Sequence, residues 1–424
     1  MAAKNTHIGI LGMGTVGTGL VELLRRNERL IESKSNVTLD IRRVLIRNSE
    51  KPRPVDRSLL TTDFESIVND PEISLVVELI GGIEPARTYI LRSLEAGKNV
   101  VTANKAVLAA HGDELFSMAA KKGRTIGFEA SVCGGIPLIR ALTTGLVANR
   151  IEQICGILNG TCNFILTKMT QDGIAYAEAL KRAQDQGLAE ADPTLDVKGL
   201  DAAHKLLILA ELCYQAKVGM DDLIVEGIDQ IEAEDIRTAK EFGFVIKLVA
   251  IGARQGEKLD LRVHPALIST NHPLSSVHNE FNAVLIKGDA IGEMIFYGKG
   301  AGSFPTASAV LSDVVEIARN PSINGFWSSR PKAQPAALEA ESRFYLRFPI
   351  YDLPGVIGLI TTALGNHQIS ITHAQATLVP EKGSRGSVKI ITHKTREGKL
   401  RQALVEVSRL PVLTSKPIAL RILE

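Results

Sequence analysis

A glycine-rich turn near the N-terminus limits the folds open to this chain. Residues 12–17 read Gly-Met-Gly-Thr-Val-Gly, directly after the strand-like run Ile8–Leu11 and before apolar residues at helical spacing. In such a turn the glycines permit a sharp bend, close approach of the backbone to a pyrophosphate, and close packing of helix on strand. The free N–H groups at the helix start attract phosphate. The context predicts a dinucleotide site, although another doubly wound fold with a glycine-rich turn remains an alternative. The predicted contacts are Gly12, Met13, Gly14, Thr15, Val16 and Gly17.

Strand-like and helix-like segments alternate through residues 7–135. This rhythm predicts an α/β fold, a Rossmann-type doubly wound parallel sheet with helices on both faces. The predicted strands are Ile8–Leu11, Ile41–Ile46, Leu75–Ile80, Val100–Thr102 and Thr125–Phe128.

The rest of the chain differs in pattern. Long helices near 174–186 and 200–216, together with a strand from Phe244 to Ile251, predict an inserted α+β domain over 136–305. Residues 306–319 predict a helix that packs back on the first domain, which therefore comprises 1–135 plus 306–330. Pro321, Pro331 and Pro335 indicate a linker before a compact C-terminal domain over 341–424.

Composition excludes several classes of protein. The net charge of +2 gives no field that favours nucleic acid or an anionic membrane. The chain has no run of eighteen apolar residues and no signal-peptide core. Its four cysteines, none in a CxxC pair, argue against structural zinc and indicate reduced thiols. We therefore expect a cytoplasmic protein without nucleic-acid or membrane partners.

The end of the second predicted strand bears on the choice of nicotinamide cofactor. An NAD site usually places a carboxylate there, against the ribose 2′-hydroxyl. Here the strand ends in Arg47 and Asn48, and Lys51 and Arg53 follow. A guanidinium pairs well with a 2′-phosphate, so the sequence favours NADP, with NAD possible.

Residues 187–205 combine four carboxylates with two lysines and a histidine, and lead directly into the apolar run 206–210. Asp201 and Lys205 are four residues apart, on one face of the predicted helix. A carboxylate beside an ammonium can orient a small polar substrate and give it a proton. The alternative is an exposed ion pair on an amphipathic helix.

Four other segments carry polar or glycine-rich patterns. Lys105 follows a predicted strand, where ligands collect in open α/β sheets, although it could be a solvated lysine. The turn 128–137 could hold a hard cation through backbone oxygens, or be a tight crossover. Residues 156–163 could form a buried hydrogen-bonding loop near substrate, or a helix cap. Residues 298–302 form a glycine-rich loop suited to closing over a cofactor.

Several motifs together resemble the homoserine dehydrogenase family. They run in order along essentially the whole chain: the turn at 12–17, Thr-Ala-Asn-Lys at 102–105, Val-Cys-Gly-Gly-Ile-Pro at 132–137, Leu-Asn-Gly-Thr-Cys-Asn at 158–163, the segment 183–205, and Gly-Ala-Gly…Pro-Thr-Ala-Ser-Ala-Val at 300–310. The chain lacks an aspartate kinase region, so it resembles the monofunctional form.

The resemblance implies reversible, NAD(P)H-dependent reduction of aspartate 4-semialdehyde to homoserine. It makes Lys205 the proton donor, with Lys105 assisting, and places substrate on Glu190, Asp196 and Asp201. It implies a sodium site of backbone carbonyls at Glu129, Val132, Gly134 and Ile136. The implied cofactor contacts beyond the turn are Arg47, Thr102, Lys105, Gly187 and Gly302.

Elementary chemistry agrees with these roles. The alkoxide that develops as hydride arrives needs a positive charge and a proton. A free lysine, with a pKa of about 10.4, is protonated at neutral pH and can donate. In the reverse direction it must first lose its proton, so we expect homoserine oxidation to be fastest at alkaline pH.

The C-terminal part resembles an ACT domain, a βαββαβ module, most clearly in Asp-Leu-Pro-Gly-Val at 352–356. N–H groups near Gly355 could bind the carboxylate of an effector such as threonine. A dimerisation module without ligand is the alternative, and we expect a homodimer or homotetramer.

Two rival functions remain open at this point. A semialdehyde dehydrogenase would act through a thioester and would need a nucleophilic cysteine with a nearby base. Cys133 and Cys162 are available, but neither has an evident histidine partner in the sequence. A non-enzymatic NADP-binding sensor would leave Asp201, Lys205 and Lys105 unexplained.

Overall fold

The computed structural model describes residues 3–48, 50–320, 330–378 and 385–423. The chain divides into two compact units. The first comprises residues 1–151, 204–220 and 286–332, and the second comprises 152–203, 221–285 and 333–424. Pro321 of the predicted linker, and residues 321–329 of the predicted first domain, lie outside the described residues.

The first unit contains a six-stranded sheet in the order β3-β2-β1-β4-β5-β6. Every pairing is parallel, which confirms the predicted doubly wound sheet. The strands are β1 (Lys4–Leu11), β2 (Val37–Leu45), β3 (Leu60–Thr61), β4 (Leu75–Glu78), β5 (Asn99–Thr102) and β6 (Ile126–Gly127). The two-residue strand β3 was not predicted, because so short a pairing leaves no periodic pattern.

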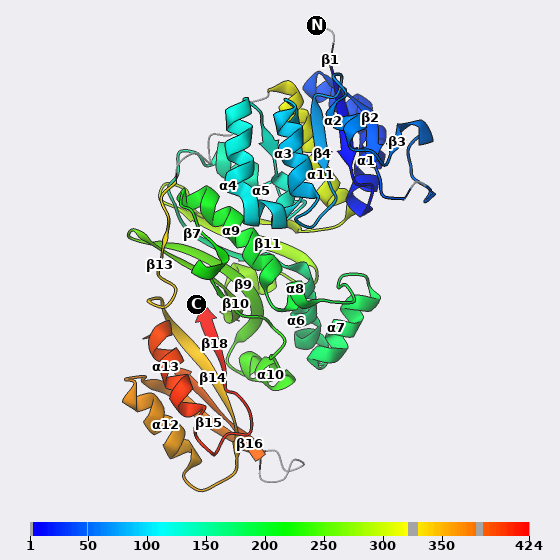
Figure 1. Ribbon diagram of the computed structural model, residues 1–424. Helices are drawn as coiled ribbons and strands as arrows, with labels where there is room; N and C mark the ends of the chain where they lie inside the picture. The colour runs from blue at the N-terminus through cyan, green and yellow to red at the C-terminus, as the bar shows by residue number, and fades with distance from the viewer. Residues whose placement is uncertain (1–2, 49, 321–329, 379–384, 424) are drawn as a thin grey trace. The chain divides into compact units, whose positions relative to one another are not determined.

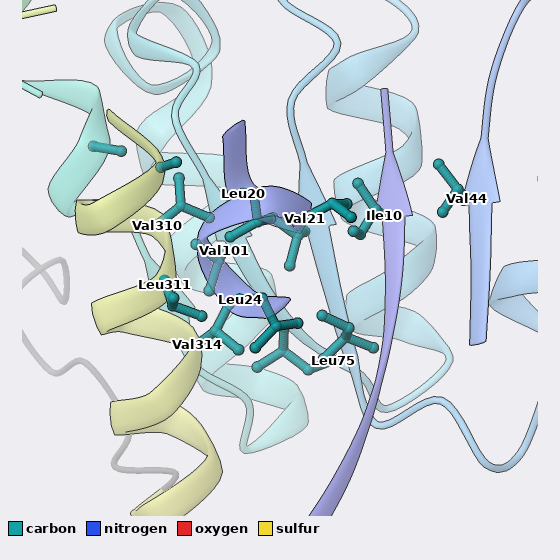
Figure 2. Packing of buried hydrophobic residues seen from close by; sticks show 14 of the residues in the cluster. Ile10, Leu20, Val21, Leu24, Val44, Leu75, Val101, Val310, Leu311 and Val314 are labelled. Carbon is teal, nitrogen blue, oxygen red and sulfur yellow. The ribbon is translucent and has the colours of Figure 1, made fainter. Parts of the chain in front are cut away.

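Helices of the first unit cover this sheet (Figure 1). They are α1 (Thr15–Ser35), α2 (Glu65–Val68), α3 (Ala86–Glu95), α4 (Lys105–Lys122), α5 (Leu138–Arg140) and α11 (Ser303–Arg319). The core lies where α1 and α11 pack on β1, β4 and β5. Figure 2 shows Leu20 and Leu24 of α1 beside Val310 and Val314 of α11. Residues 306–319 thus pack on the N-terminal sheet, close to 300 residues along the chain from α1.

The second unit is built on a mixed sheet, in the order β11-β7-β9-β10-β18-β14-β16-β15. Its longest pair is the antiparallel hairpin of β9 (Phe244–Gln255) and β10 (Lys258–Ser269). The remaining strands are β7 (Ile151–Ile157), β8 (Ile224–Val225), β11 (Phe281–Gly288), β13 (Gln334–Pro335), β14 (Glu341–Tyr351), β15 (Ile371–Leu378), β16 (Arg385–Thr392), β17 (Thr395–Arg396) and β18 (Ile418–Leu423); β12 (Gly292–Lys299) follows β11 in the chain.

Helices of the second unit are α6 (Gly160–Asp172), α7 (Tyr176–Asp185), α8 (Thr194–Val197), α10 (Ala233–Glu241), α12 (Val356–Asn366) and α13 (Glu397–Val407). Helix α9 (Leu200–Tyr214) begins in this unit and continues into residues assigned to the first. The described part of the chain contains no helix with the length and apolar character needed to cross a membrane.

The C-terminal residues follow the predicted strand-helix order, β14-α12-β15-β16-α13-β18. Helices α12 and α13 lie side by side on this part of the sheet (Figure 1). The last strand, β18, also pairs in parallel with β10, where Ala266 lies opposite Arg421. The C-terminal module therefore shares one continuous sheet with the rest of the second unit, a long-range pairing that no local pattern predicts.

Candidate functional site

Two of the three glycines in the turn at 12–17 are required by close backbone packing. A Cβ on Gly12, whose φ is +102°, would lie 2.7 Å from the carbonyl oxygen of Leu79. A Cβ on Gly17 would lie 2.4 Å from the oxygen of Gly12. Nothing lies within 4 Å of a Cβ on Gly14, so its face of the turn is open. The open face, just before α1 begins at Thr15, is where a pyrophosphate would fit.

A cavity of about 770 Å³ adjoins this turn at the carboxyl ends of β1, β2 and β4. Its walls carry the three cations that the sequence places after β2, Arg47, Lys51 and Arg53. The Nη1 group of Arg53 donates to the carbonyl of Met13 in the turn, while its Nε is buried without a hydrogen-bond partner among the described residues. The cavity therefore fits an anionic ligand that lies along the glycine turn.

A buried carboxylate organises the neighbouring strand ends. Glu78, at the end of β4, is fully buried and accepts hydrogen bonds from the Thr102 hydroxyl (2.6 Å) and the Ile80 N–H (2.6 Å). Burial raises its pKa, although these hydrogen bonds oppose the shift. The sequence did not single out Glu78, because a glutamate that ends an apolar strand is ordinarily the point where the chain leaves the core.

This network places Lys105. Thr102 accepts from the Asn104 N–H at 3.0 Å, and the Asn104 side chain caps α4 by accepting from the Val107 N–H at 3.3 Å. Lys105 is therefore fixed as the first residue of α4, at the carboxyl end of β5, half-buried. The Thr102 side chain serves Glu78, and a contact of Thr102 with cofactor stays a prediction.

The turn at 128–137 is held by the Glu129 side chain and by the backbone of neighbouring segments. The Glu129 carboxylate accepts from the N–H groups of Ile139 and Arg140, both at 2.8 Å, at the start of α5. Burial raises the pKa of Glu129. Across the turn, Gly135 donates to the carbonyl of Lys299 at 3.0 Å. Both carboxylate oxygens of Glu129 already accept hydrogen bonds, and the oxygen predicted to meet a cation is its main-chain carbonyl.

Within the described ranges, no group of three or more His, Cys, Asp or Glu side chains could hold a metal ion. A cation at Glu129, Val132, Gly134 and Ile136 would therefore depend on main-chain oxygens. The local backbone is suitably bent, since Cys133 and Gly134 have φ values of +54° and +22°. The Ile136 carbonyl already accepts from the Leu138 N–H at 2.8 Å and would have to use its second lone pair.

The glycine-rich loop at 298–302 ends beside the cofactor turn. Gly302, at a φ of +117°, precedes α11. The next residue, Ser303, donates its hydroxyl to the Thr15 carbonyl at 2.9 Å, and a Cβ on Gly19 of α1 would lie 2.3 Å from that hydroxyl. The structure thus brings Gly302 close to the start of α1, as a loop over a cofactor requires.

A second polar cluster lies in the second unit. The Asn159 amide donates to Asp196 (2.6 Å) and to Asp201 (2.8 Å), and its oxygen accepts from the Cys162 N–H to cap α6. Asn159 is thus both a helix cap and a buried hydrogen-bonding residue, while the nearness of residues 156–163 to substrate stays a prediction. We call Asn159, Asp196 and Asp201 the Asn159 cluster.

Asp201 and Lys205 are both buried, with 7% and 8% of their surfaces exposed. They lie one turn apart on α9, so the alternative of an exposed surface ion pair is wrong. Glu190, by contrast, is exposed, on the turn that follows α7 and Gly187. Gly187 has a φ of +69° and donates to the Gln184 carbonyl. The structure brings Asp196 and Asp201 together but leaves the Glu190 side chain in solvent.

The surroundings of Cys155 and Cys162 do not favour a nucleophile. Cys133, Cys155 and Cys162 are buried, and burial raises the pKa of Cys155 to about 12. The Cys162 thiol donates to the Asp196 carbonyl at 3.2 Å. A carbonyl acceptor does not favour the thiolate, which is the reactive form.

The first unit combines a parallel sheet, a glycine turn after the first strand of that sheet, and a cavity with cationic walls at the carboxyl edge of the sheet. These features are typical of a dinucleotide-dependent oxidoreductase. Residues 12–129 match the NAD-binding domain of homoserine dehydrogenase, and residues 137–315 match the homoserine dehydrogenase domain. The chain belongs to the homoserine dehydrogenase family.

Individual relatives agree over most or nearly all of the chain. Homoserine dehydrogenase of Synechocystis is 44% identical, over 98% of this chain and 99% of its own. The crystal structure of a homoserine dehydrogenase from Thiobacillus denitrificans has a TM-score of 0.92 and 40% identity, over 99% of each chain. A hyperthermophilic archaeal homoserine dehydrogenase in complex with NADPH has a TM-score of 0.64 and 27% identity, over 76% of this chain and all of its own.

Proposed function

We propose that this protein catalyses the reversible, NAD(P)H-dependent reduction of L-aspartate 4-semialdehyde to L-homoserine, in the biosynthesis of threonine, methionine and isoleucine. The observation that carries the proposal is the buried pair of Asp201 and Lys205 on α9, beside Asn159 and Asp196, in a chain that also has the cofactor turn. Family membership supports the same reaction.

Lys205 is the proposed proton donor. A bound reduced nicotinamide cofactor supplies the hydride to the aldehyde carbon. As negative charge develops on the aldehyde oxygen, the Lys205 ammonium stabilises it and transfers a proton to form the hydroxyl. Lys105, fixed at the start of α4, assists as a second positive charge.

Carboxylates account for recognition of the substrate ammonium. The Asn159 amide holds the carboxylates of Asp196 and Asp201 in fixed orientations, and both carboxylates can accept further hydrogen bonds from the substrate ammonium. Glu190 binds the ammonium from its exposed turn, and Asp201 orients the substrate close to Lys205. In the oxidative direction Lys205 must be deprotonated first, so the rate of homoserine oxidation rises toward alkaline pH.

Cofactor choice follows from the cavity beside the glycine turn. Arg47 and Lys51 line it, and the buried Nε of Arg53 has no hydrogen-bond partner among the described residues. These donors suit the 2′-phosphate of NADP better than a bare ribose hydroxyl. The archaeal relative in complex with NADPH points the same way. We therefore propose NADP as the preferred cofactor, with NAD as a weaker substitute.

A monovalent cation, sodium, is proposed to bind the backbone carbonyls of Glu129, Val132, Gly134 and Ile136. The bent backbone at Cys133 and Gly134, and the occupied Glu129 carboxylate, support a site of main-chain oxygens. Such a cation would stiffen the turn between β6 and α5.

The C-terminal βαββαβ module is proposed to act as an ACT regulatory domain. Gly355, at a φ of +84°, precedes α12, and a cavity of about 520 Å³ opens beside it, lined by Pro354, Gly355, Gly358, Leu359, Thr362, Ala363, Asn366, Glu406 and Leu410. We propose that an amino-acid effector such as threonine binds in this cavity. We also propose that the protein assembles as a homodimer or homotetramer in the cytoplasm.

The test compares wild type with Lys205→Ala, following NADPH and NADH consumption with aspartate 4-semialdehyde. We expect turnover to fall by roughly a hundredfold or more, the usual contribution of a positioned general acid, while NADPH binding is unchanged. Lys181→Ala, on an exposed position of α7, is the matched control and should retain full activity. Retained turnover in Lys205→Ala would overturn the assignment of the proton donor.

A further inference from the structure

Four charged side chains form a compact group where the C-terminal module joins the rest of the second unit. We call Glu226, Glu397, Arg401 and Arg421 the Arg421 cluster. Arg421 of β18 donates from Nε to Glu397 at 2.9 Å and from Nη2 to Glu226 at 2.9 Å. Arg401 of α13 donates to Glu397 at 2.8 Å and to Glu226 at 2.7 Å. Each arginine thus bridges the same two carboxylates.

The members of the Arg421 cluster differ in origin and exposure. Arg421 and Glu397 both belong to the C-terminal module, and their side chains are 2% and 1% exposed. Burial alone would raise the pKa of Glu397, but Arg421 and Arg401 outweigh it and lower that pKa. Glu226 follows β8, outside the module, and its side chain is 33% exposed. Glu226 is therefore the member that connects the module to another part of the unit.

The backbone next to Glu226 lies directly against the polar segment that carries Asp196 and Asp201. The Ile228 N–H donates to the Val197 carbonyl at 2.8 Å. A Cβ on Gly227 would lie 2.2 Å from the Val197 carbonyl oxygen, and a Cβ on Gly199 would lie 3.2 Å from the backbone carbonyl oxygen of Glu226. Residues 226–228 thus pack without space against 197–199, between α8 and α9.

Two members of the Asn159 cluster flank residues 197–199. Asp196 precedes Val197, and Asp201 follows Gly199 by two residues. Asn159 donates to both carboxylates, while the Ile228 N–H donates to the connecting backbone at Val197. Glu226 is held by its backbone N–H, which donates to the Val263 carbonyl of β10 at 2.8 Å, and by its side-chain contacts with Arg421 and Arg401. The position of that backbone therefore depends in part on the two arginines.

Two further ion pairs attach the C-terminal module to helix α10. Arg347 of β14 donates to Asp235 of α10 at 2.7 Å, and Lys389 of β16 pairs with Glu234 at 2.9 Å. These contacts attach the module to α10 without using Glu226. Loss of the Glu226 contacts alone would therefore leave the module attached.

We propose that Arg421 is a positioning residue, which acts through Glu226 and residues 226–228 to hold Asp196 and Asp201 in their substrate-binding arrangement. The inference rests on the proposed function for the role of the two aspartates. It gives the C-terminal module a direct physical route to the substrate side of the reaction.

Glu226→Gln is the variant that tests this proposal. It keeps the side-chain shape and leaves the Arg421–Glu397 pair intact, whereas loss of Arg421 would leave Glu397 buried without its main partner. We expect the KM for aspartate 4-semialdehyde to rise roughly fivefold, with the KM for NADPH unchanged. Glu226→Asp, which keeps the charge, should restore part of the loss.

Hydrogen exchange gives a readout that does not need activity. In Glu226→Gln, the amides of residues 196–203 and 226–228 should exchange faster, because the Ile228 to Val197 bond opens more often. Glu234→Gln is the matched control: it removes a contact of the module with α10, and its side chain is 21% exposed. It should leave both the substrate KM and exchange at 196–203 at wild-type values.

The outcomes separate the two proposals. Wild-type protein that fails to reduce aspartate 4-semialdehyde would overturn the proposed function, while hydrogen exchange would still decide whether Glu226 holds residues 196–203. Unchanged exchange and unchanged substrate KM in Glu226→Gln would overturn the positioning role. Equal effects of Glu226→Gln and Glu234→Gln would also overturn it, because the module as a whole, and not the Arg421 cluster, would then be responsible.

Discussion

At the scale of single residues, Asn159 carries more of the site than its neutral side chain suggests. Its oxygen caps α6, and its nitrogen serves Asp196 and Asp201 together. The sequence is compatible with either a helix cap or a buried hydrogen-bonding residue, since each needs the same asparagine before a helix. The structure shows one amide in both roles, which is possible because the donor and acceptor atoms point different ways.

Asn159→Asp separates those two roles. An aspartate still accepts from the Cys162 N–H, so α6 keeps its cap, but the donor to Asp196 and Asp201 is lost and a third carboxylate is added. Carboxylates this close cannot all ionise easily. We expect kcat/KM for aspartate 4-semialdehyde to fall roughly 10- to 100-fold, and the thermal midpoint to fall as well, because the added carboxylate is buried beside two others. An unchanged kcat/KM in a folded variant would show that the shared amide is not needed.

Lys247 offers a test of pH dependence, away from the proposed chemistry. It is buried in β9, where its ammonium donates to Asn163 at 3.0 Å and to the Val277 carbonyl. Burial lowers its pKa from 10.5 to about 8. Between these values the folded chain has released a proton that the unfolded chain still binds. Unfolding therefore takes up a proton, and rising pH increases the free energy of unfolding.

Lys247→Met removes this titration. From pH 8 to 10.5 we expect wild type to gain about 3 kcal/mol of stability relative to the variant, measured by denaturant unfolding at each pH. Below pH 7 the difference between the two proteins should stay constant, which serves as the internal control. If wild type gains no stability relative to the variant over this pH range, burial does not lower the pKa of Lys247.

At the scale of elements, the junction of α8 and α9 depends on close backbone contact. Gly227 fits against Val197 and Lys198 only because it lacks a Cβ. Gly227→Ala must displace residues 197–199, at a cost of about 1–3 kcal/mol in stability, and we expect a rise in the substrate KM without a change in NADPH binding. Gly145→Ala is the control, because nothing lies within 4 Å of its added Cβ. If Gly227→Ala and Gly145→Ala have the same substrate KM, substrate binding does not depend on the junction of α8 and α9.

Elements were predictable where one local pattern determines them. The apolar run before residues 12–17 gave β1, and apolar residues at helical spacing gave α1, α9 and α11. Asp201 and Lys205 could be placed on one helix face because spacing alone decides it. Glu78 and Arg421 could not be recognised, since a charged residue in a strand is ordinarily exposed, and only their distant partners Thr102 and Glu226 explain their burial.

At the scale of the whole molecule, the order of βαβ units predicted the parallel sheet, but not how the second sheet is assembled. Local patterns indicated a C-terminal module with its own strands. They contained no sign that β18 also pairs with β10, because strand pairing across roughly 150 residues leaves no local periodicity. This pairing places Arg421 within reach of Glu226 and so connects the C-terminal module to the polar segment.

We expect this protein to reduce an aldehyde with a nicotinamide cofactor. The most direct measurement incubates purified wild-type protein with aspartate 4-semialdehyde and NADPH, and quantifies both the cofactor and the amino-acid product. We predict one homoserine formed for each NADPH oxidised. NADPH that is bound but never consumed, or cofactor reduction with an acid as the product, would contradict the claim.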